Sequence, residues 1–259
     1  MNTFSPSQYF TLYFELSKKE FSVRYKQALL GFAWAVIRPS MLIFAFYVVF
    51  GKVANLQPDN NLNYFTMVYL GMMPWFLFIN VITDGGNSML SNISMVTKVY
   101  FPRILLPLSV IFVSLVDFIL MLSILIIFGK YFSIQYTVLL VLIPILILFI
   151  MVPAISIALI LAPLSALFRD IKFIIPFLAQ IGVYLTPVGF SSQIIKEKVG
   201  SLIYLNPMVL PIEAFRWIFS GVQTFDLNGA LITIAVDILL LAVSIKIFFK
   251  YQSLVVDRI

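Results

Sequence analysis

Three cationic side chains lie where a polar segment of the sequence gives way to an apolar one. Arg24 and Lys26 precede the apolar stretch, and Arg38 lies just inside it. Arginine and lysine bind phosphate groups, arginine through two parallel N–H donors. We therefore expect Arg24, Lys26 and Arg38 to meet the phosphate of an anionic lipid headgroup. The alternative is simple anchoring, in which Arg38 extends its charged end to the membrane surface.

The acidic residues are scattered, and this pattern argues against several kinds of active site. The chain has 11 Asp and Glu residues, no His and no Cys. Histidine is the commonest general base and metal ligand, and thiolates hold structural zinc, so we predict no catalytic residue and no metal site. Asp84, Asp117 and Asp237 fall in or near apolar stretches. Acids there are costly, so they either bind protons or pair with a hydroxyl or a cation on another helix.

The composition places most of the chain in lipid. Of 259 residues, 62% are hydrophobic and 11% are charged, whereas a soluble domain has roughly 25% charged residues. A bilayer core about 30 Å thick needs about 20 apolar residues in a helix. Six stretches meet or approach this length: roughly 36–54, 65–83, 104–128, 136–167, 172–188 and 229–249. The sequence therefore predicts an all-α integral membrane protein, one membrane domain over 1–259 with six transmembrane helices.

The segment 5–30 is expected to form an amphipathic helix in the membrane surface. Ser5 and Gln8 have the spacing of a capping box, which satisfies backbone donors at a helix start. Glu20 and Arg24 lie one turn apart, a spacing that favours an ion pair along the helix. With aromatic residues on one face and cations on its flank, such a helix lies between headgroups and acyl chains.

The distribution of cations predicts the orientation. With six spans and both termini in the cytoplasm, twelve of the 17 Lys and Arg residues lie inside and five lie outside. Cytoplasmic loops carry an excess of Lys and Arg. The sequence therefore predicts cytoplasmic N- and C-termini.

The loop 85–103 has the character of a cytoplasmic handle for a partner protein. Gly85 and Gly86 are expected to end the second span, and a short, weakly amphipathic helix follows. Apolar residues at helical spacing suit a socket on another protein. A charged turn further along the chain is a second candidate contact. The predicted contact residues in these two places are Met89, Ile93, Val96, Arg169 and Asp170.

The segment 189–228 is semi-apolar and contains Pro207 and Pro211. We expect short re-entrant helices here that dip into the outer interface between spans five and six. Irregular backbone at membrane depth is tolerated only against protein or a water-filled cavity. Such a segment would therefore line a path.

Four stretches of the chain, taken in order, carry a family resemblance. They are RYKQALLGFAWAVIRPSMLIFAFYVVFG (24–51), KVYFPRILLPLS (98–109), LFRDIKFIIPFLAQIGVYLTPV (167–188) and LNPMVLPIEAFR (205–216). The ordered set resembles the permease subunits of ABC transporters that export polysaccharides and teichoic acids. Among these, it is most similar to the O-antigen exporters.

The resemblance implies a six-span subunit of the bacterial inner membrane that pairs as a homodimer. Two copies of a separate ATPase bind on the cytoplasmic side and hold ATP and magnesium, so this chain needs no cofactor and no nucleic acid partner. The dimer encloses a channel for a glycan on a polyprenyl pyrophosphate lipid, and the outer segment 189–228 gates its exit. In such proteins the interface helix, the Leu30-Gly31 turn and the loop with Lys98 and Arg103 contact or adjoin the ATPase.

Aromatic side chains suit the wall of a glycan channel, because sugar C–H bonds pack on ring faces. The chain has 26 Phe, 12 Tyr and 3 Trp residues, and many of them are expected in the interfacial belts of any membrane protein. The candidates for the channel wall are Phe46, Tyr47, Tyr69, Trp75, Phe76, Tyr184 and Tyr204.

ATP hydrolysis by this chain is not expected. A phosphate-binding loop needs the pattern G-x-x-x-x-G-K-[ST]. The only Gly-Lys pairs, Gly51-Lys52 and Gly129-Lys130, lack both the upstream glycine and the following Ser or Thr. An ATPase partner must therefore supply the site if ATP drives the protein.

Two other functions remain open at the level of sequence. A membrane transferase acting on polyprenyl phosphate usually needs clustered acids that hold Mg²⁺, whereas here no two acids adjoin. An ion-coupled flippase of lipid-linked glycans would use acids within its spans, and only Asp117 and Asp237 support it. Metal loading would favour the transferase, and transport driven by a gradient alone would favour the flippase.

Overall fold

The computed structural model describes residues 5–26, 31–56, 58 and 62–258, and every regular element in this part of the chain is helical. The elements of the first half are α1 (Pro6–Tyr25), α2 (Ala33–Phe46), the π-helix η1 (Tyr47–Val53), α3 (Tyr64–Ser91), α4 (Ile93–Lys98) and α5 (Leu105–Ile127). Those of the second half are the 3-10 helix η2 (Val138–Leu142), α6 (Ile143–Leu167), α7 (Ile171–Leu185), α8 (Ser192–Val199), the 3-10 helix η3 (Gly200–Leu205), α9 (Val209–Ser220) and α10 (Leu227–Arg258). The predicted all-α fold is confirmed for the described residues.

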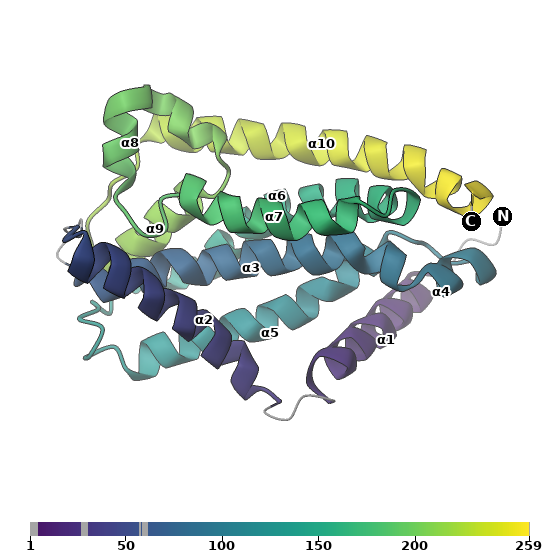
Figure 1. Ribbon diagram of the computed structural model, residues 1–259, viewed down its shortest axis with the longest axis horizontal. Helices are drawn as coiled ribbons and strands as arrows, with labels where there is room; N and C mark the ends of the chain where they lie inside the picture. The colour runs from purple at the N-terminus through teal and green to yellow at the C-terminus, as the bar shows by residue number, and fades with distance from the viewer. Residues whose placement is uncertain (1–4, 27–30, 57, 59–61, 259) are drawn as a thin grey trace.

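Helix α1 begins with the capping box that the sequence predicts. The Ser5 side chain accepts a hydrogen bond from the Gln8 backbone N–H, and the Gln8 side chain accepts one from the Ser5 N–H at 2.8 Å. The helix ends at Tyr25 and packs against α5, beside which it lies in Figure 1. It buries Leu16 and Ser17, so one face of α1 belongs to the protein interior rather than to the membrane surface.

Helix α3 is the central element of the bundle. It contacts α2, α5, α6, α7 and α9 and runs through the middle of the molecule in Figure 1. In its most apolar stretch 78% of the residues are buried inside the protein, against 22% for the corresponding stretch of α10. The other long helices therefore keep lipid-accessible faces around α3.

The second span is longer than the sequence predicts, because Gly85 and Gly86 lie inside α3 rather than at its end. A Cβ added at Gly85 would lie 2.8 Å from the Cβ of Ala158 in α6, and one added at Gly86 would lie 3.0 Å from the Cβ of Leu161. The first distance is shorter than real carbon–carbon contacts, and the second is at their lower limit. The two glycines therefore serve the close approach of α3 and α6, not a turn.

Five helical stretches are long and apolar enough to span a membrane: Ala33–Val53, Tyr64–Ser91, Leu105–Ile127, Val138–Leu167 and Leu227–Val255. They correspond to five of the six predicted spans. The remaining predicted span, 172–188, falls on α7, whose 15 residues reach only about 22 Å. Because a bilayer core is about 30 Å thick, the sixth crossing stays a prediction.

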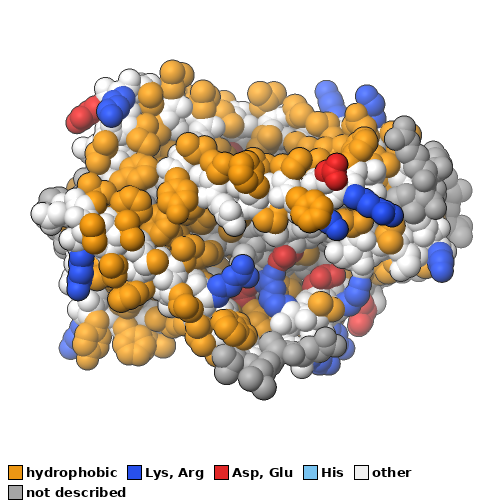
Figure 2. Space-filling model, viewed as in Figure 1, with side chains coloured by type: hydrophobic (Ala, Val, Ile, Leu, Met, Phe, Trp, Pro, Cys, Tyr) orange, Lys and Arg blue, Asp and Glu red, His pale blue; other side chains and the backbone are white. Residues whose placement is uncertain are grey.

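The outer surface of the bundle is apolar over most of its length. Figure 2 shows hydrophobic side chains spread over most of this face, with a group of charged side chains just below its centre. On α7, Phe173, Phe177 and Leu185 are more than half exposed. Exposed apolar patches this extensive belong in lipid or against another protein.

Short helices occupy the segment between α7 and α10, as the sequence predicts. Helices α8, η3 and α9 lie at the end of the molecule opposite the two termini (Figure 1). Most of α9 is buried, and it contacts α3 and α6. Its re-entrant position in a membrane remains a prediction.

Candidate functional site

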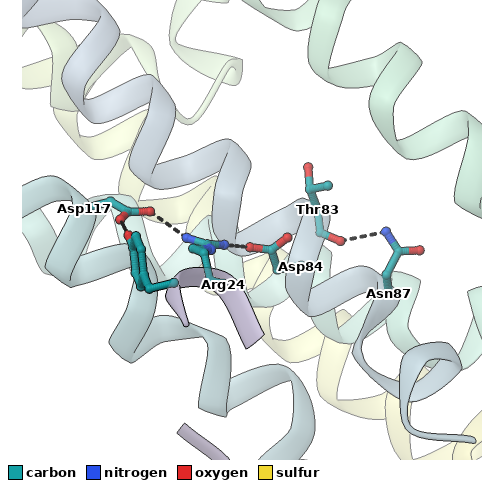
Figure 3. Close-up of polar contacts among 6 residues, drawn as sticks. Arg24, Thr83, Asp84, Asn87 and Asp117 are labelled. Carbon is teal, nitrogen blue, oxygen red and sulfur yellow. Dashed lines mark hydrogen bonds and ion pairs between the residues drawn. The ribbon is translucent and has the colours of Figure 1, made fainter. Parts of the chain in front are cut away.

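The most concentrated charged contact among the described residues joins α1 to α3 and α5 (Figure 3). The Arg24 guanidinium in α1 donates through Nη2 to Asp84 of α3 and through Nη1 to Asp117 of α5, the latter at 2.5 Å. The neighbouring Tyr25 hydroxyl donates to the other carboxylate oxygen of Asp117. One arginine thus bridges two helices, each of them long and apolar enough to span the membrane.

The charge of Arg24 is fixed by this arrangement. Burial opposes the charge, but the carboxylates of Asp84 and Asp117 outweigh burial and raise the pKa of the guanidinium above its usual value. Burial, and then the hydrogen bond to Asp117, raise the pKa of Tyr25. Arg24 therefore stays cationic and Tyr25 stays a neutral donor over the whole physiological range. The pairing also answers the question left open for Asp84 and Asp117, because each meets a cation on another helix.

The same arrangement corrects the ion pair expected within α1. The sequence favours Glu20–Arg24, whereas Arg24 turns across to α3 and α5. Lys19 likewise donates to the Asn92 side chain beyond the end of α3. Asp84 and Asp117 are held in place by packed helices, so together they stabilise Arg24 more than Glu20 would. An ion pair between residues one turn apart on a helix contributes only a few tenths of a kcal/mol.

A cavity of about 220 Å³ lies beside the Arg24–Asp84 pair. Its lining includes Glu20, Asn87 and Ser91 as well as the pair itself. Asn87 donates to the Thr83 carbonyl at 2.8 Å, as Figure 3 shows. Glu20 and Asp84 would repel an anion in this cavity. A phosphate group is therefore expected to bind to cations outside it.

Two such cations are present. Lys26 and Arg38 are both exposed, Lys26 directly after α1 and Arg38 in the first half of α2. The stacked rings of Tyr25 and Phe32, with centroids 4.4 Å apart, hold the two helices together there. Of the three cations that the sequence singles out, Arg24 is thus engaged within the protein and the other two face outward.

The predicted turn at Leu30-Gly31 is described only in its second residue, since Leu30 lies outside the described part of the chain. Gly31 has a φ of +47°, a left-handed conformation that glycine adopts without steric cost. Helix α2 begins two residues later. The expected redirection of the chain between α1 and α2 therefore uses this glycine.

The residues expected to contact a partner from the loop 85–103 have a different role. Met89 and Val96 are almost completely buried, in a cluster with Leu16, Phe248 and Val255 of α1 and α10. The prediction that they face a partner is wrong for this pair, because their helical spacing reflects internal packing. Ile93 is half-buried against the same cluster.

Three consecutive exposed side chains lie at the end of α4 and directly after it. Lys98 is exposed, and Val99 and Tyr100 are 53% and 75% exposed. Arg103 is directed inward and donates to the Gln252 carbonyl of α10 at 3.0 Å. A valine and a tyrosine exposed next to a lysine make a better contact surface than the buried face does.

The second predicted contact, the turn between α6 and α7, is accessible. Arg169 and Asp170 are both exposed there. The turn lies at the same end of the molecule as α4 and the two chain termini (Figure 1).

Five of the seven candidate channel aromatics fall into two groups. Tyr69, Trp75 and Tyr204 are buried inside the protein, and the Tyr69 hydroxyl donates to the Met121 carbonyl at 2.8 Å. Tyr184 is 60% exposed and stacks on Phe46 with ring centroids 5.7 Å apart. The buried group packs the core, and the stacked pair of α2 and α7 presents a ring to the surroundings.

The other two candidates, Tyr47 and Phe76, are half-buried. Tyr47 begins η1, and its ring meets that of Phe65 edge-on at 5.5 Å. Phe76 lies in α3 and packs against the main core.

The segment 186–216 contains a buried polar network that the sequence did not predict. Glu213 and Arg216 of α9 are 1% and 2% exposed. Glu213 accepts a hydrogen bond from Ser192, and Arg216 donates to the carbonyls of Pro187 and Val188, both at 2.8 Å. The sequence signal for this network was the spacing of Glu213 and Arg216, an acid and a base three residues apart in an apolar segment. Residues at this spacing can share one helix face.

Asp237 differs from the other two membrane acids. It is 4% exposed in α10, and among the described residues neither carboxylate oxygen has a hydrogen-bond partner. The expected pairing is therefore found for Asp84 and Asp117 and not for Asp237.

Comparison with known proteins identifies the family. The family model described as "ABC-2 type transporter" matches residues 11–220. The O-antigen export system permease protein RfbA of Myxococcus xanthus is 27% identical over 243 residues, covering 93% of this chain and 92% of that protein. A Klebsiella pneumoniae protein of the same name is 26% identical over 244 residues, covering 94% and 93%. With the family model covering well over half of its length and with five apolar helices long enough to span a membrane, the chain belongs to the ABC-2 type transporter family and is a multi-pass membrane protein.

Proposed function

We propose that this chain is the membrane-spanning subunit of an ATP-driven exporter that moves polyprenyl-pyrophosphate-linked O-antigen polysaccharide out of the cytoplasm across the bacterial inner membrane. The observation that carries the proposal is the end-to-end match to proteins named O-antigen export system permease, which covers 92% and 93% of two of them. The chain lacks the sequence pattern of a phosphate-binding loop, which fits a subunit that takes its energy from a partner.

The partners in this proposal are two copies of an ABC ATPase, which hold ATP and magnesium, and a second copy of this chain. The ATPase binds the end of the molecule where α4, the start of α7 and both chain termini lie together (Figure 1). Its contact surface consists of Lys98, Val99 and Tyr100, with the exposed turn at Arg169 and Asp170. This end faces the cytoplasm, in keeping with the excess of cations there.

The pyrophosphate of the cargo lipid binds at the exposed cations Lys26 and Arg38. Arg24 has a positioning role, since its guanidinium already holds Asp84 and Asp117. The sugar chain then passes the exposed ring of Tyr184, which Phe46 supports from behind. Aromatic faces bind sugars weakly enough for repeated release.

Movement reaches the spans through α1. Because Arg24 ties α1 to α3 and α5 at once, a push on α1 by the closing ATPase displaces two spans together. Rigid-body displacement of packed helices is a common way to open a path. The buried face of Met89 and Val96 against α1 and α10 transmits the same push from the loop 85–103.

The pairing of Asp117 with Arg24 weakens the ion-coupled alternative, because a carboxylate held by a cation and a phenol is a poor proton carrier. Asp237 is then the remaining support for an ion-coupled flippase. The transport experiment below separates the two functions.

The test is transport in vesicles that contain lipid-linked O-antigen, prepared with this chain alone and with its cognate ATPase. We expect glycan to cross only when both proteins and ATP are present, and to stop when the ATPase carries an inactive phosphate-binding loop. Transport by the chain alone under an ion gradient would refute the proposal in favour of the flippase. If no glycan crosses although the ATPase is active and bound, the proposal that O-antigen is the exported substrate is refuted.

A further inference from the structure

The larger of the two cavities described here lies far from the Arg24 cluster, at the end of the molecule that carries η1 and the start of α3. Its volume is about 630 Å³, within the range of roughly 300–1,000 Å³ that is typical of small-molecule sites. The end of α2 with η1, the start of α3 and the segment that follows α5 line it. It opens to the surroundings, so a ligand can reach it without any opening of the bundle.

Several aromatic rings line this cavity. The rings of Tyr47 and Phe65 meet edge-on at 5.5 Å. Tyr64 is fixed from two sides, because its hydroxyl donates to the Gly189 carbonyl and its ring lies where a Cβ of Gly51 would be. Tyr131, 84% exposed, stands at the rim. Ring faces held in place before binding lose little conformational entropy when a ligand packs on them.

Polar side chains also line the cavity. Asn55 and Asn63 line the cavity, and Lys52 lies over the Tyr47 ring at 5.6 Å from its centroid. Asn55 has a φ of +51°, a left-handed conformation that asparagine tolerates better than most residues. Asn63 caps α3 through the Thr66 N–H at 2.7 Å, which fixes its position. No acid is among the described residues that line the cavity.

This combination points to one class of ligand. An acyl chain needs an apolar slot without amides, and a strongly anionic ligand needs more than one cation. A pyranose ring suits the site, because its C–H face packs on aromatic rings and its hydroxyls both donate to and accept from carboxamides. One lysine also accommodates an acidic sugar.

We propose that this cavity, bounded by Tyr47, Tyr64, Phe65, Asn55 and Lys52, is a saccharide subsite that holds a short segment of glycan. The inference rests on the proposed function, since it takes the exported glycan as its ligand. It adds a place where the emerging chain is held, within one copy of the protein. Such a subsite hinders the glycan from slipping back between strokes of the ATPase.

The test is site-specific photo-crosslinking in cells that make the glycan and carry the complete transporter. Tyr131 at the rim is replaced by p-benzoylphenylalanine, and the matched control carries the same replacement at Tyr136, which is 58% exposed and does not line the cavity. Export of glycan to the cell surface is measured on the same cultures. We expect a ladder of glycan-linked permease from position 131 and at least a severalfold weaker ladder from position 136.

A second variant, Asn55→Gly, removes the amide while keeping the left-handed backbone conformation, so folding is preserved. We expect it to reduce the ladder from position 131 severalfold. Equal ladders from 131 and 136, or a ladder that Asn55→Gly leaves unchanged, would overturn the subsite. Normal export without a ladder from 131 overturns the subsite alone, whereas cells whose transporter exports no glycan overturn the proposed function and the subsite together.

Discussion

The Arg24 guanidinium of α1 donates to the Asp117 carboxylate of α5 at 2.5 Å, across 93 positions of sequence. The contact joins a helix expected at the membrane surface to a helix that can span the membrane. Asp84 of α3 shares the same guanidinium, so the surface helix is held to both.

Replacing Arg24 by Ala is expected to destabilise the protein. It leaves Asp84 and Asp117 without their cation, and breaking a fully buried pair costs about 3–5 kcal/mol. Because the Arg24 and Asp84 side chains are 29% and 37% exposed, we expect a smaller loss, roughly 2 kcal/mol. Thermal unfolding of the detergent-solubilised protein measures it. Adding Asp84→Asn and Asp117→Asn to Arg24→Ala should restore part of the stability, and no recovery would contradict the electrostatic explanation.

Replacing Arg38 by Ala is expected to impair glycan export without loss of assembly. Arg38 is exposed, and its guanidinium offers a bidentate site for phosphate. Export to the cell surface and co-purification of the ATPase are the two measurements. Lys130→Ala, at an exposed cation near the other end of the molecule, is the matched control. Full export by the Arg38 variant would remove the headgroup role.

Replacing Gly85 by Leu is expected to force α3 and α6 apart. Overpacking of this kind costs typically about 1–3 kcal/mol, and a Cβ at this position already meets Ala158 at 2.8 Å. Thermal unfolding should show a clear loss against Ala242→Leu, which also introduces a leucine, at an exposed position of α10. Equal stability of the two variants would mean that the helices do not approach so closely.

The loop 85–103 should separate into a packing face and a contact face. Val96→Ala removes buried methyl groups and is expected to lower stability by about 1–3 kcal/mol, with ATPase binding retained by the folded fraction. Val99→Asp changes an exposed side chain and is expected to abolish ATPase co-purification at unchanged stability. The reverse pattern would show that the buried face, not the exposed one, meets the partner.

Asp226 gives a pH dependence whose sign can be worked out. Its carboxylate accepts from the Gly229 N–H at 2.7 Å and from Lys196 at 3.1 Å, and the first of these contacts contributes most to lowering its pKa below the usual value. A lowered pKa in the folded state stabilises the protein above the ordinary carboxyl pKa, and the contribution is lost as pH falls through the folded value. Asp226→Asn should therefore reduce the loss of stability that occurs as the pH is lowered below neutrality.

The expected size of that change follows from the helix cap. Asp226 caps the start of α10, and loss of a cap costs about 1 kcal/mol; asparagine caps nearly as well, so most of the loss at neutral pH should come from Lys196. Thermal unfolding between pH 7 and pH 3 measures both effects. An unchanged loss of stability at low pH would show that other carboxylates dominate it.

Local features of the chain could be predicted from sequence because their causes are local. The capping box of Ser5 and Gln8 needs only residues three apart, and five of the spans needed only sustained apolar length. The lack of a phosphate-binding pattern likewise depends on a short motif. Whether α7 crosses the membrane was not decided in this way, since its length falls between that of a span and that of a buried helix.

Partner choice was decided by the tertiary structure alone. Arg24 could pair with Glu20 on its own helix, and only the approach of α3 and α5 assigns it to Asp84 and Asp117. Met89 and Val96 have the same spacing whether they face a partner or α10. A glycine such as Gly85 is equally expected in a turn and where two helices approach closely, so its presence does not distinguish the two. Periodicity tells which residues share a face of a helix, but what covers that face depends on which helices the rest of the chain brings beside it.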